Sequence, residues 1–141
     1  MVLNYPHFLF TPFYQEFTYS NNIILILACM GTRSVYQCNK CDYRVETSGG
    51  FDYGMRLATD AYLCSKCKEI VAVSVGVYGE KLSPEECVVK QAEMEFNMDF
   101  YKCPECGSGD HLILWDTKKK PCPKCGGRLK KDRSQSILLW D

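Results

Sequence analysis

The sequence predicts a small, mainly β protein made of two metal-stabilised modules that are joined by one helix. The chain has 141 residues, enough for one ordinary domain or two very small ones. Modules of this size bury too little apolar surface to be stable alone, so they usually depend on disulfides or metal ions. Ten residues are cysteines, and eight of these form four Cys-x-x-Cys pairs: Cys38/Cys41, Cys64/Cys67, Cys103/Cys106 and Cys122/Cys125.

The compartment decides whether these pairs bind metal or form disulfides. The first 30 residues contain no Lys or Arg, and their apolar run, residues 23–29, is too short to span a bilayer. We therefore expect a cytoplasmic protein without membrane association, in which paired thiols stay reduced and bind metal.

Residues 1–29 differ in composition from the rest of the chain. They hold seven aromatic residues by Tyr19 and one acidic or basic residue, Glu16. One interpretation is an apolar arm that packs on a partner or a membrane surface. The other, which the composition favours, is that translation begins at Met30 and that the upstream residues carry no function.

Residues 30–79 are expected to form the first module. Short strands are predicted at 35–37, 43–47 and 61–63, with a turn at 48–50. The clearest strand covers residues 71–77, where valine occupies every second position.

Residues 80–100 are predicted to be an acidic helix and linker. Ser83 suits a helix cap, Pro84 the first helical position, and Glu86 completes a capping box. The helix is expected to end near Phe96 and to place four residues on one side: Cys87, Val88, Ala92 and Phe96. Its acidic face is interpreted as solvated surface.

Residues 101–141 are expected to form the second module, with strands at 112–116, 128–131 and 137–141. The first and last of these share the pattern Leu/Ile-Trp-Asp. We interpret them as neighbouring strands whose tryptophans, Trp115 and Trp140, cover a small core. Chance similarity over five residues is an equal alternative.

The eight paired cysteines are the predicted metal ligands. Zinc in structural sites prefers four tetrahedral ligands, and thiolate is a common one. In the second module fifteen residues separate the two pairs, a spacing typical of zinc sites, and a glycine follows each pair, Gly107 and Gly126. In the first module twenty-two residues intervene, and Asp42 and Lys68 take the place of the glycines.

Which turns share one metal ion is a separate question. Pairing of sequence-adjacent turns closes the shorter loops and is preferred, while a site shared by Cys38/Cys41 and Cys103/Cys106 stays open as an alternative.

These motifs resemble zinc ribbons, the rubredoxin-like class of small metal-binding folds. The segment from Cys103 to Gly127 carries the resemblance most closely, and the segment from Cys38 to Cys67 carries it less closely. The resemblance implies two ribbons in tandem, each a three-stranded sheet clamped by one zinc, and so two zinc ions per chain. The alternative is a rubredoxin-like iron protein in electron transfer. Disulfides and thioredoxin-like redox pairs are disfavoured, because neither a secretion signal nor the βαβ context is present.

The sequence offers no candidates for catalysis. Four thiolates close each predicted site, and the two histidines, His7 and His111, lie outside a recognisable catalytic motif. The chain is therefore expected not to be an enzyme and not to take a small-molecule substrate. Cys29 and Cys87 have no assigned role.

The expected function is that of an adaptor that binds another macromolecule, a protein or a nucleic acid. A protein would contact the acidic helix and the aromatic edges. A nucleic acid would contact a basic cluster and stack a base on Trp115 or Trp140, although the lysines can equally serve only to solubilise a small domain. The net charge of zero argues against a general polyanion binder. The basic cluster comprises Lys118, Lys119, Lys120, Lys124, Arg128, Lys130, Lys131 and Arg133.

Overall fold

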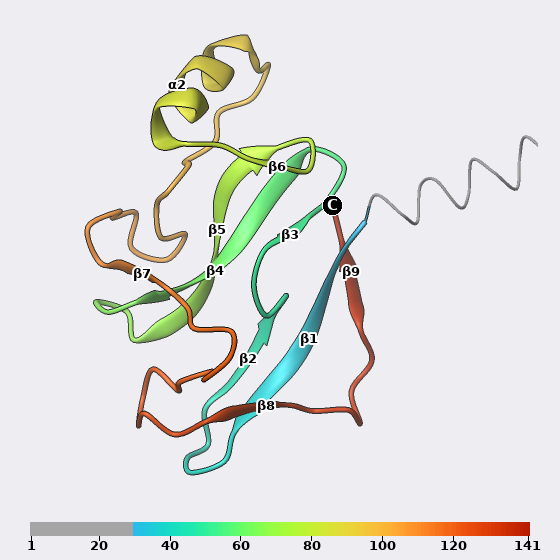
Figure 1. Ribbon diagram of the computed structural model, residues 1–141, viewed down its shortest axis with the longest axis vertical. Helices are drawn as coiled ribbons and strands as arrows, with labels where there is room; N and C mark the ends of the chain where they lie inside the picture. The colour runs from blue at the N-terminus through green and yellow to red at the C-terminus, as the bar shows by residue number, and fades with distance from the viewer. Residues whose placement is uncertain (1–29) are drawn as a thin grey trace, which may run out of the picture.

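The computed structural model describes residues 30–141, and the expectations for residues 1–29, including Cys29 and His7, lie outside this range. Two antiparallel sheets and one helix make up the described part (Figure 1). The first sheet contains β1 (Gly31–Cys38), β2 (Arg44–Thr47), β8 (Leu129–Lys131) and β9 (Leu138–Trp140). The second contains β3 (Asp52–Tyr53), β4 (Leu57–Cys64), β5 (Glu69–Val77), β6 (Glu80–Lys81) and β7 (Leu112–Leu114). This small, mainly β architecture with a helix and two cysteine clusters is consistent with the predicted class.

Strand β1 organises the first sheet. It pairs with β2, and the end of the chain returns along it, with β8 beside its last residues and β9 beside its first. The Asp52 carboxylate ties this end together, because it accepts hydrogen bonds from the Thr32 backbone N–H (2.6 Å) and from the Trp140 indole N–H (3.0 Å). The C-terminus therefore lies next to the start of β1 (Figure 1).

The hairpin of β4 and β5 organises the second sheet. The predicted alternation in β5 is confirmed, since Val71, Val73, Val75 and Val77 are all buried. The four residues that connect the two strands lie within the Cys64–Lys68 turn, so the hairpin itself places one cysteine pair. The alternating valines and the Cys64/Cys67 pair thus lie in the same β-hairpin.

Each sheet combines strands from both predicted modules. Strand β7 pairs with β4, and β8 and β9 pair with β1, so neither sheet is confined to the strands of one expected ribbon. The prediction that residues 112–116 and 137–141 form neighbouring strands is wrong, because they belong to different sheets. The alternation of apolar and polar residues in a three-residue strand is too short to specify its pairing partner. Packing against distant parts of the chain determines the partner instead.

The two sheets share a core. Tyr36 and Leu129 of the first sheet pack in one cluster with Ala61 and Ile70 of the second. Trp115 lies in this cluster, 2% exposed, with its ring edge-on to Tyr36 at 6.0 Å. Trp115 therefore covers the core as predicted, whereas Trp140 lies apart from this cluster with Arg33 over its ring.

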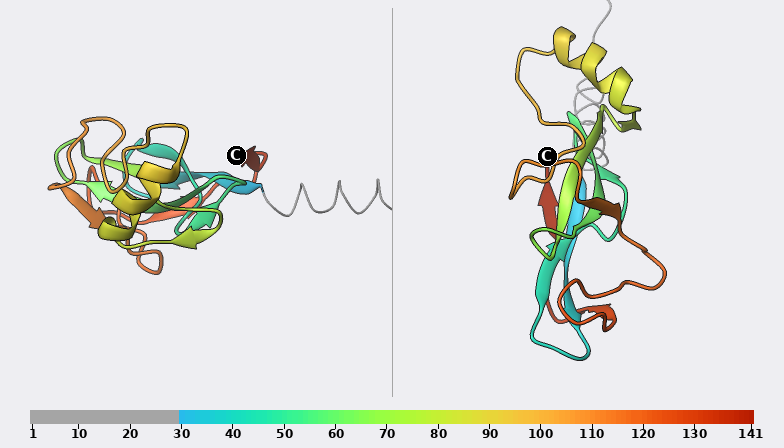
Figure 2. Two further views of the ribbon diagram at one scale, coloured as in Figure 1. Left: turned by 90° about the horizontal axis from the view of Figure 1, so that it is seen from above. Right: turned by 90° about the vertical axis from the view of Figure 1, so that its left-hand side faces the viewer.

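Helix α2 (Pro84–Glu93) begins as predicted and ends three residues before the expected Phe96. Ser83 and Glu86 form the predicted capping box. Of the residues expected on one side of the helix, Cys87 is 1% exposed and Val88 is 72% exposed, so only part of that side is buried. The helix lies beyond one end of the sheets, so only a narrow side of it reaches β5 (Figure 2). Across residues 30–141, no helix combines the length and apolar character that crossing a lipid bilayer requires.

Candidate metal centres

The eight paired cysteines come together in two groups of four, each of which can hold a metal ion. We call the first group site A, which comprises Cys38, Cys41, Cys122 and Cys125. We call the second group site B, which comprises Cys64, Cys67, Cys103 and Cys106. In each site the four sulfur atoms lie within 4.8 Å of one another.

The preferred pairing of sequence-adjacent turns is wrong, and the alternative that joined Cys38/Cys41 to Cys103/Cys106 is not found either. Strand pairing explains the outcome, because β1–β8 and β4–β7 each bring an early turn beside a late one. Loop entropy opposes this only weakly, since it grows with the logarithm of loop length. Closing the segment between Cys41 and Cys122 rather than that between Cys41 and Cys64 costs about 1 kcal/mol more.

The spacing of the sulfur atoms fits a tetrahedral tetrathiolate. A zinc ion at about 2.3 Å from each sulfur sets its ligands about 3.8 Å apart. In site A the Cys38–Cys125 and Cys41–Cys122 sulfurs are 3.5 and 3.7 Å apart. In site B the Cys64–Cys106 and Cys67–Cys103 sulfurs are 3.8 and 4.0 Å apart. These distances are about twice a disulfide bond, and all eight cysteines are free thiols.

The turns have the backbone that metal-binding loops need. Gly107 and Gly126 adopt φ angles of 72° and 69°, and each donates its N–H to the carbonyl of the first cysteine of its turn. This confirms the expectation that glycine supplies a left-handed residue there. Lys68 adopts the same conformation, φ 53°, at the equivalent position after Cys67, although lysine is poorly suited to it.

The ionisation of the thiols in site A is uneven. Burial opposes ionisation of the Cys38 thiol, but hydrogen bonds from the backbone N–H groups of Lys40 and Cys41 outweigh it and lower the pKa to about 6. For Cys41, a backbone hydrogen bond from Tyr43 favours the thiolate, but burial and the neighbouring thiols outweigh it and raise the pKa to about 12.

Site B repeats this pattern. The pKa of Cys64 is lowered to about 7 in spite of burial, because hydrogen bonds to the thiolate dominate. Burial and neighbouring thiols raise the pKa of Cys67 to about 12. In both sites one thiol thus ionises readily and a neighbour resists, as expected where thiols lie so close together that ionisation of one opposes ionisation of the next.

In each site, hydrogen bonds that the sequence analysis did not predict join the two segments that carry the cysteine pairs. In site A, Asn39 donates its backbone N–H to the Arg128 carbonyl (3.0 Å) and accepts the Arg128 N–H on its side chain (2.9 Å). In site B, Ser65 donates its backbone N–H to the His111 carbonyl (2.9 Å). The two backbone bonds leave no mark in the sequence, and only the side-chain acceptor of Asn39, which follows the first cysteine of its turn, could have indicated a bridge.

The two sites differ in exposure. Cys125 of site A is exposed, whereas every cysteine of site B is buried or half-buried. A shallow hollow of about 280 Å³ also opens beside Cys38, with Lys130 and Asn39 in its lining. Solvent and solutes therefore reach site A more easily than site B.

The basic cluster lies around site A, and part of it is already engaged. Lys124 forms an ion pair with Glu69 (2.8 Å), and Lys120 lies over the Tyr36 ring at 5.5 Å. The Arg128 guanidinium donates to the Lys118 carbonyl (3.4 Å). The exposed members are Lys118, Lys119, Lys124, Arg128, Lys130, Lys131 and Arg133. Trp115 is buried beneath this region, so it offers no face on which a base could stack.

Comparison with known proteins gives no match, neither to a family model, nor to a curated protein, nor to a solved structure.

Proposed function

We propose that this chain is a structural zinc protein, an adaptor in which two zinc ions hold together a surface that binds another macromolecule. The observation that carries the proposal is that each cysteine group joins an early turn to a late one at tetrathiolate spacing. Zinc bound there would act as a clamp across the chain, and such sites contribute on the order of 10 kcal/mol to folding.

Neither site is expected to catalyse a reaction. A catalytic zinc keeps an open position for water or substrate, and four thiolates leave none. Both cysteine groups already supply four sulfurs each. Metal ions bound there would therefore be structural, and the protein would function through the surfaces that these ions stabilise.

A protein is the better supported partner. The nucleic-acid site expected from the sequence would stack a base on Trp115 or Trp140 beside its phosphate contacts, but Trp115 is buried and Arg33 lies over the Trp140 ring. At the opposite end of the molecule, α2 exposes two apolar side chains, Val88 (72%) and Val89 (63%). Exposed apolar residues beside a groove are typical of protein-binding surfaces.

The test of the metal is elemental analysis of untagged protein purified without added metal. Two zinc ions per chain and a colourless solution are expected. A Cys41→Ser/Cys122→Ser variant, with two ligands removed from site A, should retain one zinc, while Cys87→Ala, outside both sites, should retain two. A red protein containing iron would replace the proposal with the electron-transfer alternative, and a metal-free, folded protein would refute both.

A further inference from the structure

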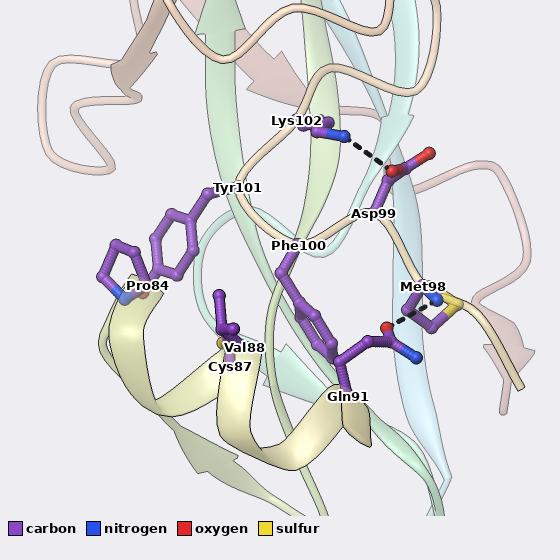
Figure 3. A pocket seen from close by; sticks show the side chains of 9 residues that line it. All are labelled: Pro84, Cys87, Val88, Gln91, Met98, Asp99, Phe100, Tyr101 and Lys102. Atoms are coloured by element: carbon purple, nitrogen blue, oxygen red, sulfur yellow. Dashed lines mark hydrogen bonds and ion pairs between the residues drawn. The ribbon is translucent and has the colours of Figure 1, made fainter. Parts of the chain in front are cut away.

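Helix α2 and the segment that follows it enclose an apolar groove of about 310 Å³. One wall comes from α2 and contains Pro84, Val88 and Gln91, and the other contains Met98, Phe100 and Tyr101 (Figure 3). The volume suits one or two large apolar side chains.

Hydrogen bonds fix both walls of this α2 groove. The Gln91 side chain donates to the Phe96 carbonyl and accepts the Met98 backbone N–H, both at 2.8 Å. The Tyr101 hydroxyl donates to the Leu82 carbonyl (2.5 Å), and its backbone N–H donates to the Ser74 carbonyl of β5 (2.9 Å). The groove is therefore preformed, which lowers the entropy cost of filling it.

An apolar stripe continues from the groove over the outer side of α2. Val88 and Val89 are 72% and 63% exposed, and the side chain of Val88 also lines the groove. Because burial of exposed apolar side chains is favourable, this stripe and the groove together offer a larger apolar contact than the groove alone.

Carboxylates dominate the charge around the stripe. Residues 80–102 contain six acidic and three basic residues. The three lysines are all engaged, Lys81 with Asp60, Lys90 with Glu93 and Lys102 with Asp99. Within residues 30–141, no ion pair involves Glu85, which lies one turn from Val88, or Glu95. Arg56, which lies over the Phe96 ring (6.0 Å), is a cation from outside this segment, but the acidic residues of 80–102 still outnumber the nearby basic ones and favour a cationic partner.

We propose that the α2 groove binds a partner protein through a segment that inserts a large apolar side chain and carries flanking lysine or arginine residues. The segment's apolar residue fills the space beside Val88 and Phe100, and its cationic residues face Glu85 and Glu95. This inference rests on the proposed adaptor function and names its partner class.

The test uses the zinc-loaded full chain as bait for a phage-displayed library of random twelve-residue peptides. Selected peptides are expected to combine a large apolar residue with lysine or arginine. Their affinity, measured by fluorescence anisotropy, should fall at least tenfold in Val88→Glu and two- to fivefold in Glu85→Gln/Glu95→Gln, with a weaker salt dependence in the latter. The matched control is Ile113→Glu, because Ile113 is also an exposed apolar residue (59%) but lies on β7; this variant should bind the peptides within twofold of the parent.

Different outcomes would contradict the proposed groove and the proposed adaptor function. Selected peptides that bind Val88→Glu and Ile113→Glu equally well would overturn the groove but leave the adaptor standing. The same holds if only a labelled twenty-residue oligo(dT) binds, and Lys130→Glu/Lys131→Glu abolishes that binding. If neither the library nor the oligonucleotide yields binding to protein with two zinc ions, both proposals fail.

Discussion

Lys68 occupies the backbone position that glycine occupies after two of the other cysteine turns. Its φ of 53° places a side chain in the left-handed region, where the Cβ atom of a non-glycine residue costs roughly 1–2 kcal/mol. The Lys68 N–H nevertheless bonds to the Cys64 carbonyl at 2.8 Å, as the glycines do in their turns. The turn therefore requires a left-handed residue at this position, although lysine does not favour that conformation.

Replacing Lys68 with glycine should stabilise the zinc-loaded protein by about 0.5–1 kcal/mol, because the relief of strain exceeds the extra chain entropy of glycine. Thermal unfolding of the loaded protein measures this. Lys66→Gly in the same turn, where φ is negative, should be neutral or destabilising. Equal losses in both variants would show that Lys68 carries no strain.

The ion pair of Lys81 and Asp60 is the most buried one in the described range. The Asp60 side chain is 8% exposed, and its oxygens meet the Lys81 ammonium (2.7 Å) and the Ala61 N–H (2.9 Å). Lys81→Met leaves this carboxylate without its cation and should cost about 1–3 kcal/mol at pH 7. Lys90→Met, which breaks the exposed pair with Glu93, should cost less than about 0.5 kcal/mol.

The pH dependence of this effect has a definite sign. The hydrogen bond to Asp60 raises the pKa of Lys81, so its contribution to stability is complete below the unfolded value of about 10.4 and is lost as the pH rises through the folded one. Denaturation measured from pH 7 to pH 11.5 should show parent and Lys81→Met converging only at the alkaline end. A difference that stays constant over this range would contradict the ion-pair explanation.

At the scale of elements, features that depend on a few neighbouring residues could be predicted from the sequence. The capping box at Ser83, the valine alternation in β5 and the left-handed glycines of two turns follow from interactions within a few residues, and all three are found. The partners of β7, β8 and β9 could not be predicted in this way. Residues 112–116 and 137–141 are nearly identical in sequence, yet one segment pairs with β4 and the other with β1. The contacts that distinguish them lie in other parts of the chain.

Helix α2 should depend strongly on its cap, because only a narrow side of it is buried. The Ser83 hydroxyl accepts the Glu86 N–H at 3.2 Å, and the Glu86 carboxylate accepts the Ser83 N–H at 2.7 Å. Ser83→Ala should destabilise the helix by about 1 kcal/mol, seen as faster amide exchange at residues 84–93. Ser83→Asp keeps an acceptor at this position and should restore most of the protection. Equal exchange in both variants would show that the cap does not hold the helix.

At the scale of the whole molecule, the two cysteine groups lie on separate sheets, and a metal ion in each would clamp its own sheet. Site A joins the turn after β1 to the turn before β8, and site B joins the β4–β5 turn to the turn before β7. The eight cysteines could be identified from spacing alone. Their division into sites could not, because it follows from the sheet pairing, and the loop-entropy preference of about 1 kcal/mol is small beside it.

The unequal exposure of the sites predicts an order of metal loss. Cys125 is exposed and a hollow opens beside Cys38, so a chelator should remove the ion of site A first. Hydrogen exchange during titration with EDTA should show β8 and β9 losing protection before β4 and β5 do. Simultaneous loss in both sheets would mean that the two clamps unfold as one unit.

The interleaved pairing itself can be tested without further structural work. Cys41→Ser/Cys122→Ser removes two ligands from site A and leaves site B with four, so it should retain one tightly held zinc. Cys41→Ser/Cys64→Ser removes one ligand from each site, leaves two sites with three thiolates, and should lose both ions to a moderate chelator. Sequence-adjacent pairing predicts the opposite, because Cys41 and Cys64 would then share a site and the second ribbon would keep its zinc. Zinc per chain after dialysis against the chelator separates the two arrangements, since the order of the two variants reverses between them.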